Sequence, residues 1–388
     1  MDYHKEFLNI VKGFGDRVRL SGSRGELDAV KYIKNYIVRN IGGKSIIQKF
    51  KILTWREKST PSLIVAGETV SCRSAYYSPK SNIKGKLEYF TENTEEKENE
   101  FDVYCIKNSS GTILSLLYVS QKYPNPFYYN RGSATYLMPS VIVGSDYRDF
   151  FTKNIGKEVK LRIDAKYLVK NSYNLVHKLS NRKNKFKLII GAHMDTVPQS
   201  KGIFDNASGV AGAMIISKIL KNIKLPFDIW IVYFGAEENA MFGSKFFVET
   251  LSEAEIKMAR YMISIDGIGM GDKTCLYSEK DYFTQLKRSF GEIGENAIID
   301  DVDNMLDASD HYYFKLMGVD SCFVEGQPGT FYYHSKEAND LANLNVELSV
   351  KTVQSLIEFI KNIEFQSPRV VFENRKTRVL QRILNFLK

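Results

Sequence analysis

The chain contains few of the residues that build disulfide frameworks or thiolate metal sites. Its 388 residues include only four cysteines, nine prolines and two tryptophans. The cysteines are widely separated and form no Cys-x-x-Cys pair, which argues against a zinc finger and a disulfide scaffold. We therefore expect four free, buried thiols at Cys72, Cys105, Cys275 and Cys322.

Long hydrophobic runs are also absent. No stretch approaches the roughly 20 apolar residues that span a bilayer. The first residues, MDYHKEFLNIVKGFGDRVRL, are charged and lack the apolar core of a secretory signal. The sequence therefore predicts no transmembrane segment and a cytoplasmic location, with a processed secreted form as the alternative.

The charge balance is basic, with a formal net charge of +9. The Lys and Arg residues are scattered, and no nucleic-acid-binding motif accompanies them. Hydrophobic residues make up 44% of the chain and charged residues 26%, an ordinary globular composition. We expect a solvated basic surface and no nucleic-acid partner. The sequence shows no internal repeat and no low-complexity segment.

The pattern along the chain changes twice. Residues 1–58 read as helix followed by strand, with Ser23 and Glu26 spaced as a capping box. Residues 59–171 contain short β-like runs separated by turn residues, with one short helix near DYRDFFTKNI. From residue 172 strands alternate with helices, which is typical of a parallel sheet covered by helices.

The predicted fold class is therefore α/β. We expect a mixed, mostly parallel central sheet flanked by helices, formed by residues 1–58 and 172–366, with a smaller β-rich domain inserted at 59–171. Residues 367–388 read as a basic amphipathic helix. That helix is expected to pack against its own domain, with a dimer interface or a membrane surface as the alternatives.

Five residues stand in local sequences that predict a shared metal site. KLIIGAHMDTVP, IWIVYFGAEENAMFGS and YMISIDGIG are apolar strands that end in polar residues, and the carboxyl ends of strands are where open α/β sheets keep their sites. GIFDNASGV and FYYHSKEAND supply an Asp and a His from loops. Taken singly, each residue can equally be a cap or a satisfied polar group. Together they predict a two-metal site with the ligands His193, Asp205, Glu238, Asp266 and His334.

Two further carboxylates accompany these ligands. Asp195 follows His193 by two residues, so in an extended chain it lies on the same side and can orient that imidazole. Glu237 and Glu238 are neighbours that point opposite ways in extended geometry, so Glu237 can face a substrate as general base. Neither His4 nor His177 lies in a motif, and both are expected at the surface.

In sequence order, GAHMDTVP, FDNASGV, GAEENAMFGS, ISIDGIG, SDHYYF and YYHS resemble the co-catalytic zinc aminopeptidase family, which includes aminopeptidase S, aminopeptidase Y and glutamate carboxypeptidase. RLSGSRGELDAVKYI is similar to the start of that family. The segment PSVIVGSDYRDFFTKNIGKEVKLRI looks like part of a protease-associated (PA) domain, which would shape substrate access.

This resemblance implies a division of labour within the site. One zinc is held by His193 and Asp266, the other by Glu238 and His334, and Asp205 bridges both. The resemblance also implies Glu237 as general base and Asp195 in support of the ligands. Tyr333 occupies the place of a tyrosine that hydrogen-bonds the oxyanion, although Tyr332 and Tyr333 can equally be packing aromatics. Ser309-Asp310-His311 has no evident chemical role beyond scaffolding.

The resulting functional prediction is a metallo-aminopeptidase that acts on peptides through a di-zinc-activated water, with Co²⁺ or Mn²⁺ as substitute ions. A carboxypeptidase and a glutaminyl cyclase-like enzyme remain alternatives on the same fold. The pair His193-x-Asp195, which would build a second metal site, argues against the single-zinc cyclase. A non-catalytic binding module is a third alternative, which the intact ligand set disfavours.

Overall fold

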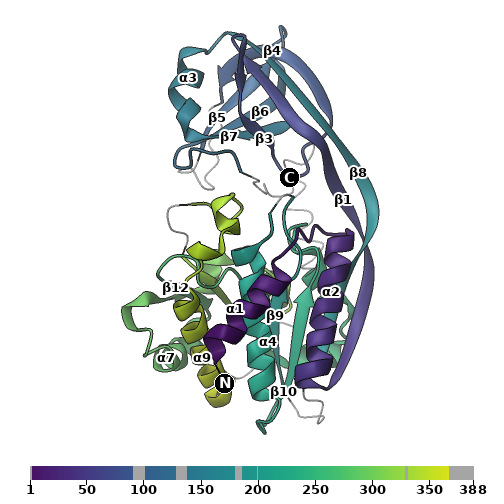
Figure 1. Cartoon of the computed structure of the whole chain (residues 1–388), viewed down its shortest axis with the longest axis vertical. Helices are drawn as coiled ribbons and strands as arrows, with labels where there is room; N and C mark the ends of the chain where they lie inside the picture. The colour runs from purple at the N-terminus through teal and green to yellow at the C-terminus, as the bar shows by residue number, and fades with distance from the viewer. Residues whose placement is uncertain are drawn as a thin grey trace.

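The computed structural model describes residues 2–90, 101–127, 138–179, 186–198, 200–327 and 331–366. The described residues form two lobes joined by a long two-stranded ribbon (Figure 1). The predicted helix at 367–388 lies outside the described residues.

The larger lobe is built on a mixed sheet. Its centre consists of the parallel neighbours β10 (Asp228–Phe234), β9 (Lys187–His193), β11 (Ala259–Ile265) and β14 (Asp320–Gly326). On one side the sheet continues antiparallel to β12 (Thr274–Ser278), which pairs in parallel with β13 (Ala297–Asp301). Every residue of β9, β10 and β11 is buried, as expected of parallel strands covered on both faces.

Helices cover both faces of this sheet. One core lies under α1 (Tyr3–Phe14), α2 (Arg24–Tyr36), α4 (Gly209–Leu220), α7 (Phe283–Ser289) and α9 (Val346–Asn362). The opposite core lies under α5 (Phe242–Thr250), α6 (Glu253–Met258) and α8 (His311–Leu316). Alternate residues of β9 face the two cores, since Ile190 belongs to the first and Ile189 to the second. The predicted α/β class is therefore confirmed.

The smaller lobe is β-rich. Among the described residues it contains β2 (Glu68–Val70), β3 (Cys72–Ser74), β4 (Ser81–Tyr89), β5 (Phe101–Lys107), β6 (Ile113–Ser120), β7 (Ser140–Val143) and the α-helix α3 (Arg148–Lys153). These strands enclose a separate apolar core. The β-like runs and the short helix expected between residues 59 and 171 are all present. The likeness to a PA domain stays a prediction.

The two lobes share one pair of strands rather than flexible linkers. β1 (Lys44–Val65) and β8 (Glu158–Lys178) pair antiparallel along almost their whole length, as the ribbon on the right of Figure 1 shows. The proposed domain boundaries at 58/59 and 171/172 fall inside these strands, so the chain passes between lobes without leaving the sheet. This ladder, which is irregular between Glu57 and Ser62, constrains how one lobe moves relative to the other.

Helix α2 begins as expected, but only half of its predicted capping box forms. The Ser23 side chain accepts a hydrogen bond from the backbone N of Glu26 at 3.3 Å. The Glu26 carboxylate does not return to Ser23; it accepts from the backbone N of Gly22 at 2.8 Å and from the hydroxyl of Ser172. Burial against β8 redirects this side chain, because Ser172 offers it a second donor. After one π-helical turn, Ile37–Ile41, the helix ends at Gly42.

Two expectations about single residues have opposite outcomes. The four cysteines are free and buried, as predicted. The surface position expected for His177 is wrong, because this residue is buried. It lies on β8, which is an inner strand between β1 and β10. Its Nε2 lies 2.9 Å from the carbonyl oxygen of Gly42. His4 is half exposed, as expected.

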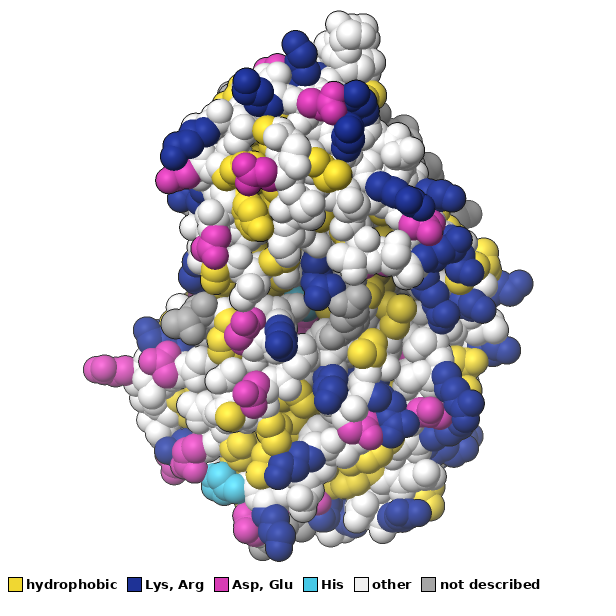
Figure 2. Space-filling model, turned by 45° about the horizontal axis from the view of Figure 1, so that its top comes forward, with side chains coloured by type: hydrophobic (Ala, Val, Ile, Leu, Met, Phe, Trp, Pro, Cys, Tyr) yellow, Lys and Arg dark blue, Asp and Glu magenta, His cyan; other side chains and the backbone are white. Residues whose placement is uncertain are grey.

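Surface charge and hydropathy agree with the composition. Lys and Arg side chains are spread over the face that Figure 2 shows, interspersed with Asp and Glu. Among the described residues, the stretch Ile203–Leu220 is long and apolar enough to cross a membrane by length and composition alone, but 89% of it is buried inside the fold. It contains α4, which the first apolar core surrounds.

Among the described residues, three of the contacts between the small lobe and the large lobe lie beside the predicted site. The hydroxyl of Tyr76 donates to Oδ1 of Asn239 at 3.0 Å. The ring of Tyr332 lies 4.2 Å from that of Phe127, and Val197 is part of the small lobe's apolar core. Asn239, Tyr332 and Val197 each lie within four residues of a predicted metal ligand. The small lobe therefore packs directly on the loops that build the site.

Replacing Tyr76 with Phe tests the polar contact between the lobes. The substitution keeps the buried ring and removes the hydroxyl that donates to Asn239. We expect Tyr76→Phe to lower the free energy of unfolding by about 1 kcal/mol, measured from the urea midpoint. Tyr89→Phe, at a tyrosine that is 49% exposed, is the control and should have no effect. Equal midpoints for the two variants would contradict the contact.

Candidate metal centre

The predicted site residues meet at one edge of the central sheet. His193 is the last residue of β9, Glu237 and Glu238 follow β10, and Asp266 follows β11. Because these strands are parallel neighbours, their carboxyl ends bring the side chains together. Asp205 lies in the segment Ile203–Ser208 just before α4, where its own backbone is not helical, and His334 lies in the loop that follows β14.

The five predicted ligands form two triplets that share Asp205. In the first, Nε2 of His193 lies 2.8 Å from Oδ1 of Asp205 and 3.3 Å from Oδ1 of Asp266. In the second, Nε2 of His334 lies 2.9 Å from Oδ2 of Asp205 and 3.4 Å from Oε1 of Glu238. Within each triplet the candidate ligand atoms all lie within 4.8 Å of one another. Each oxygen of Asp205 thus faces a different histidine.

The histidines of the cluster favour the protonated state. Burial opposes their charge, but the carboxylates of Asp266 and Glu237 raise the pKa of His193 well above its ordinary value. His334 is likewise buried, and the Glu238 carboxylate raises its pKa to about 10. In the absence of metal cations, each imidazole is therefore protonated, and its positive charge is stabilised by the surrounding carboxylates.

The carboxylates outnumber the positive charge that the two imidazoles supply. Burial raises the pKa of Glu238 to about 7, and it also raises the pKa of Asp266 and Glu237. Asp205 is the exception, because its hydrogen bonds with the two histidines outweigh burial and lower its pKa. A site with two imidazole nitrogens, three ligand carboxylates and excess buried acid fits two divalent cations of the zinc type.

Asp195 organises the backbone beside the cluster. Its Oδ1 accepts from the backbone N of Glu237 at 3.0 Å, and its Oδ2 accepts from the backbone N of Glu238 at 3.2 Å. The hydroxyl of Ser21 donates to Oδ2 at 2.6 Å. The Nδ1 atom of His193 lies 3.6 Å from Oδ1. Asp195 thus supports the two glutamates more directly than it orients the histidine.

The glutamate loop has an unusual backbone. Ala236, Ala240 and Met241 all have positive φ angles, between 55° and 59°, a region that non-glycine residues seldom occupy. These residues flank Glu237 and Glu238. Such a turn costs free energy, and the two hydrogen bonds to Asp195 offset part of that cost.

Asn206 ties the shared ligand to the neighbouring strand. Its Nδ2 donates to the carbonyl oxygen of Ile265 at 2.9 Å, and its Oδ1 accepts from the backbone N of Gly209 at 2.9 Å and of Gly267 at 3.3 Å. The peptide bond between Asp205 and Asn206 is cis. The side-chain amide of Asn206 thus links the loop before α4 to the end of β11, where Asp266 lies.

Packing and hydrogen bonding to the oxyanion were the two roles considered for Tyr332 and Tyr333, and the two residues differ in their contacts. Tyr332 is buried against the small lobe and donates its hydroxyl proton to the hydroxyl of Tyr333 at 3.1 Å. Tyr333 is 36% exposed, and its ring lies 4.2 Å from that of His334. Tyr332 is therefore a packing aromatic, while Tyr333 presents its hydroxyl group beside the cluster.

The Ser309-Asp310-His311 motif packs beneath Asp266. The hydroxyl of Ser309 donates to Oδ2 of Asp266 at 3.0 Å. The ring of His311 stacks on Phe323, and burial lowers its pKa to about 3, so it is neutral. Asp310 is fully buried, and burial raises its pKa to about 7. Ser309 orients a candidate ligand, while His311 serves the packing of α8.

Four residues that contact the site had no assigned role in the sequence analysis: Arg19, Ser21, Asn206 and Asn239. Arg19 is completely buried, which is rare for arginine, and it donates to backbone carbonyls around the cluster. The signal for Arg19 and Ser21 was the segment RLSGSRGEL, in which these two polar residues precede the N-cap residue Ser23 and do not themselves cap the helix. Asn206 and Asn239 each directly follow a candidate ligand in sequence.

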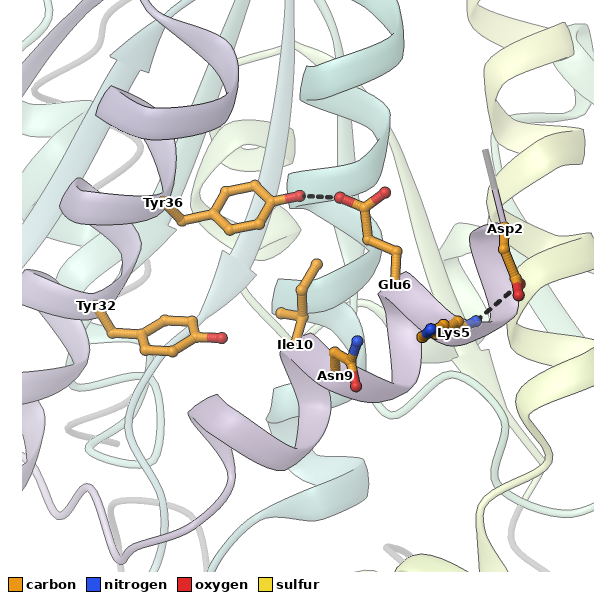
Figure 3. A pocket seen from close by; sticks show the side chains of 7 residues that line it. All are labelled: Asp2, Lys5, Glu6, Asn9, Ile10, Tyr32 and Tyr36. Atoms are coloured by element: carbon orange, nitrogen blue, oxygen red, sulfur yellow. Dashed lines mark hydrogen bonds between the residues drawn. The ribbon is translucent and has the colours of Figure 1, made fainter.

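A separate hollow lies between α1 and α2. It has a volume of about 450 Å³ and is lined by Asp2, Lys5, Glu6, Asn9, Ile10, Tyr32 and Tyr36 (Figure 3). The Tyr36 hydroxyl donates to Oε1 of Glu6 at 2.7 Å, and Nζ of Lys218 donates to the same oxygen at 2.6 Å. These polar groups satisfy one another, and none of the candidate ligands lines this hollow.

The segment that carries this site is similar to known proteins. Residues 174–360 match the model of Peptidase family M28. A segment of 196 residues is 30% identical to aminopeptidase YwaD of Bacillus subtilis, covering 47% of this chain and 42% of that protein. Leucine aminopeptidase 2 of Trichophyton equinum is 29% identical over 112 residues, covering 29% of this chain and 23% of that protein. The aligned segments thus span less than half the length of these curated relatives.

Solved structures extend the likeness of the fold to nearly the whole chain. The aminopeptidase from Aneurinibacillus sp. strain AM-1 has a TM-score of 0.73 at 20% identity, covering 96% of each chain. BSAP, a zinc aminopeptidase from Bacillus subtilis, has a TM-score of 0.72 at 18% identity, covering 92% of this chain and 94% of that chain. The chain therefore shares its overall fold with these solved structures. The match of residues 174–360 to Peptidase family M28 agrees with the resemblance seen in the motifs.

Glu26 gives the region behind Asp195 a pH dependence that can be tested in metal-free protein. Burial, and after it the nearby Asp195 carboxylate, raise the pKa of Glu26 to about 8. The folded state therefore keeps a proton that the unfolded state releases above the ordinary glutamate range near pH 4.5. The stability contributed by Glu26 is complete below that range and is lost as the pH rises toward 8, by about 1.4 kcal/mol per pH unit.

We expect Glu26→Gln to remove this pH dependence. The free energy of unfolding of the variant should rise relative to that of the wild type between pH 5 and pH 8. Urea unfolding at several pH values measures the difference, with the exposed Glu249→Gln as a matched control that shows none. A constant difference across that range would show that Glu26 titrates normally.

Proposed function

We propose that this chain is a metal-dependent aminopeptidase that hydrolyses the first peptide bond of peptides, with two zinc ions as its native cofactors. The observation that carries the proposal is the pair of ligand triplets that share Asp205. The match to Peptidase family M28 supports a hydrolase acting on peptide bonds. The names of the relatives, which include zinc and leucine aminopeptidases, support action at the amino terminus.

The proposed ligand assignment follows the two triplets. His193 and Asp266 hold one ion, Glu238 and His334 hold the other, and Asp205 bridges both because each of its oxygens faces a different histidine. Co²⁺ and Mn²⁺ are suitable substitutes, since they accept the same nitrogen and oxygen ligands. When bound, the two cations supply Lewis acidity, which polarises a carbonyl and lowers the pKa of a water molecule.

Glu237 is the proposed general base. Its side chain is 13% exposed, and its Oε2 lies 3.9 Å from Nε2 of His193, so it borders the cluster without entering either triplet. Its carboxylate takes a proton from the attacking water and passes it to the nitrogen of the leaving peptide, as the new C–O bond forms and the C–N bond breaks. The hydrogen bond from its backbone N to Asp195 holds it in place.

Tyr333 is the proposed oxyanion donor. Its partly exposed hydroxyl accepts the hydrogen bond from Tyr332, which leaves its own proton free to donate to a substrate oxygen. The ring contact with His334 keeps the hydroxyl beside the cluster. A hydrogen bond to the developing negative charge lowers the barrier selectively, because that charge is absent from the bound substrate.

Among the described residues, the buried cation beneath the cluster favours an aminopeptidase over a carboxypeptidase. A carboxypeptidase needs a positive side chain that can reach the terminal carboxylate of its substrate. Arg19, which lies beneath the cluster, is completely buried and donates to backbone carbonyls, so it offers nothing to a substrate. The excess of carboxylates around the site suits the cationic amino terminus of a peptide instead.

The decisive experiment is hydrolysis of a panel of aminoacyl chromogenic amides by the purified protein. Activity should disappear on chelation and return with added zinc. Glu237→Gln should lower kcat by about 10²–10⁴-fold without changing metal content, because it removes the proton carrier and no ligand. Glu253→Gln, an exposed acid-to-amide change on α6, should behave as the wild type.

Failure of this experiment would be informative in two ways. Silence across the panel with metals bound would reject the aminopeptidase and favour the carboxypeptidase alternative. Full activity of the Glu237→Gln protein would reject Glu237 as the base.

Metal stoichiometry tests the bridging role of Asp205 separately. Asp205→Ala should weaken both ions, because it removes an oxygen from each triplet, whereas His334→Ala should leave one ion on the His193 side. Elemental analysis after dialysis against trace zinc measures the content of each variant. Retention of two ions by the Asp205→Ala protein would contradict a shared ligand.

A further inference from the structure

We propose that Arg19 is a positioning residue that holds two ligand-bearing loops at their working separation before metal binds. The inference rests on the metal site proposed above. Within the part of the chain that the structure describes, the side chain of Arg19 donates its hydrogen bonds to backbone carbonyls and forms none with a candidate ligand side chain. It therefore acts through the chain that carries the ligands.

One side of the guanidinium group joins the two loops directly. Its Nε donates to the carbonyl oxygen of Met194 at 2.7 Å, and Met194 lies between His193 and Asp195. Its Nη1 donates to the carbonyl oxygen of Lys201 at 2.6 Å, and its Nη2 donates to that of Gly202 at 3.1 Å. Gly202 lies three residues before Asp205. One planar group thus ties the end of β9 to the loop of the shared ligand.

The guanidinium group also anchors these loops to the end of the first helix. Nη1 also donates to the carbonyl oxygens of Phe14 at 3.3 Å and Arg17 at 3.2 Å, just beyond the end of α1. The guanidinium carbon lies 4.4 Å from the centre of the Phe14 ring, a cation–π contact. The backbone N of Arg19 donates to the hydroxyl of Thr196 at 3.1 Å, which adds a second contact to the residues that follow β9.

The loop backbone is shaped to accept this group. Gly202 has a φ of +54°, and a Cβ atom there would lie 2.9 Å from Nη2 of Arg19 and 2.1 Å from the carbonyl oxygen of Asp205. A side chain at position 202 would therefore push the arginine and the ligand loop apart. Glycine allows the carbonyl of residue 202 to turn toward the guanidinium.

Charge gives the same residue a second influence on the cluster. Arg19 is fully buried, and burial lowers its pKa to about 10, so it stays cationic at neutral pH. The carboxylates of Asp205 and Asp195 are the nearest charges that oppose this effect. A fixed cation beneath the cluster reduces repulsion among its carboxylates while metal is absent.

Arginine suits both tasks and lysine suits only one. The planar guanidinium has five N–H donors in fixed directions, which match several carbonyls at once. A lysine ammonium would keep the charge but would not reach carbonyls on three separate segments. Comparing the two therefore separates geometry from charge.

The test measures zinc affinity rather than turnover. Arg19→Lys and Arg19→Gln are titrated with zinc against a chromophoric chelator, at a temperature where circular dichroism shows each protein folded. We expect both to bind zinc about 10–100-fold more weakly than the wild type. Arg17→Lys and Arg17→Gln are matched controls in the same segment, because Arg17 is exposed and pairs with Asp16. The controls should bind zinc normally.

A milder variant guards against unfolding. Thr196→Val keeps the shape of the side chain and removes the acceptor of the Arg19 backbone N, so a severalfold loss of zinc affinity is expected. Wild-type affinity in Arg19→Lys would overturn the geometric role, and wild-type affinity in all three variants would overturn the inference altogether. If the wild type itself bound no zinc, the metal proposal would fail, and this inference with it.

Discussion

The structure depends on one electrostatic constraint, which is the burial of several carboxylates and two imidazoles at a single edge of the sheet. Asp205 sits between His193 and His334, while Glu238 and Asp266 approach from neighbouring strands. Burying such acids without counter-charge is costly. The fold accommodates the cluster because hydrogen bonds and packing contacts hold the backbone that carries the ligands. The nitrogen and oxygen donors of the ligands are also suited to bind cations.

The supports come from parts of the chain far apart in sequence. The segment around Arg19 reaches the loops of His193 and Asp205, Asp195 supports the backbone of the glutamates, and Asn206 joins the Asp205 loop to β11. The small lobe adds contacts from outside, through Tyr76 and through the packing of Tyr332. Because β1 and β8 extend through both lobes, they fix the position of the small lobe, and so of these contacts, relative to the central sheet.

Much of the fold could be predicted because its signals are local. Apolar runs such as KLIIGAH and IWIVYF are buried strands, and the polar residues after them lie at the sheet edge. The β-rich character of residues 59–171 also followed from short runs and turn residues. The extent of β1 and β8 was missed, because turn-like residues inside a long ribbon look the same as residues in a linker. His177 was misplaced because its burial depends on the strands on either side of it.

The sequence by itself determined which residues can bind metal and roughly where each lies on its strand or loop, since residue type and strand ends are local properties. Tertiary structure decided which oxygen of Asp205 faces which histidine. It also decided that Glu26 accepts a hydrogen bond from Ser172 instead of completing the capping box, and that Arg19 is buried beneath the cluster. Apart from the contact between His193 and Asp205, those outcomes depend on contacts between residues more than a hundred positions apart. No local pattern encodes them, because they result from how the packed sheet and helices share a limited number of buried donors and acceptors.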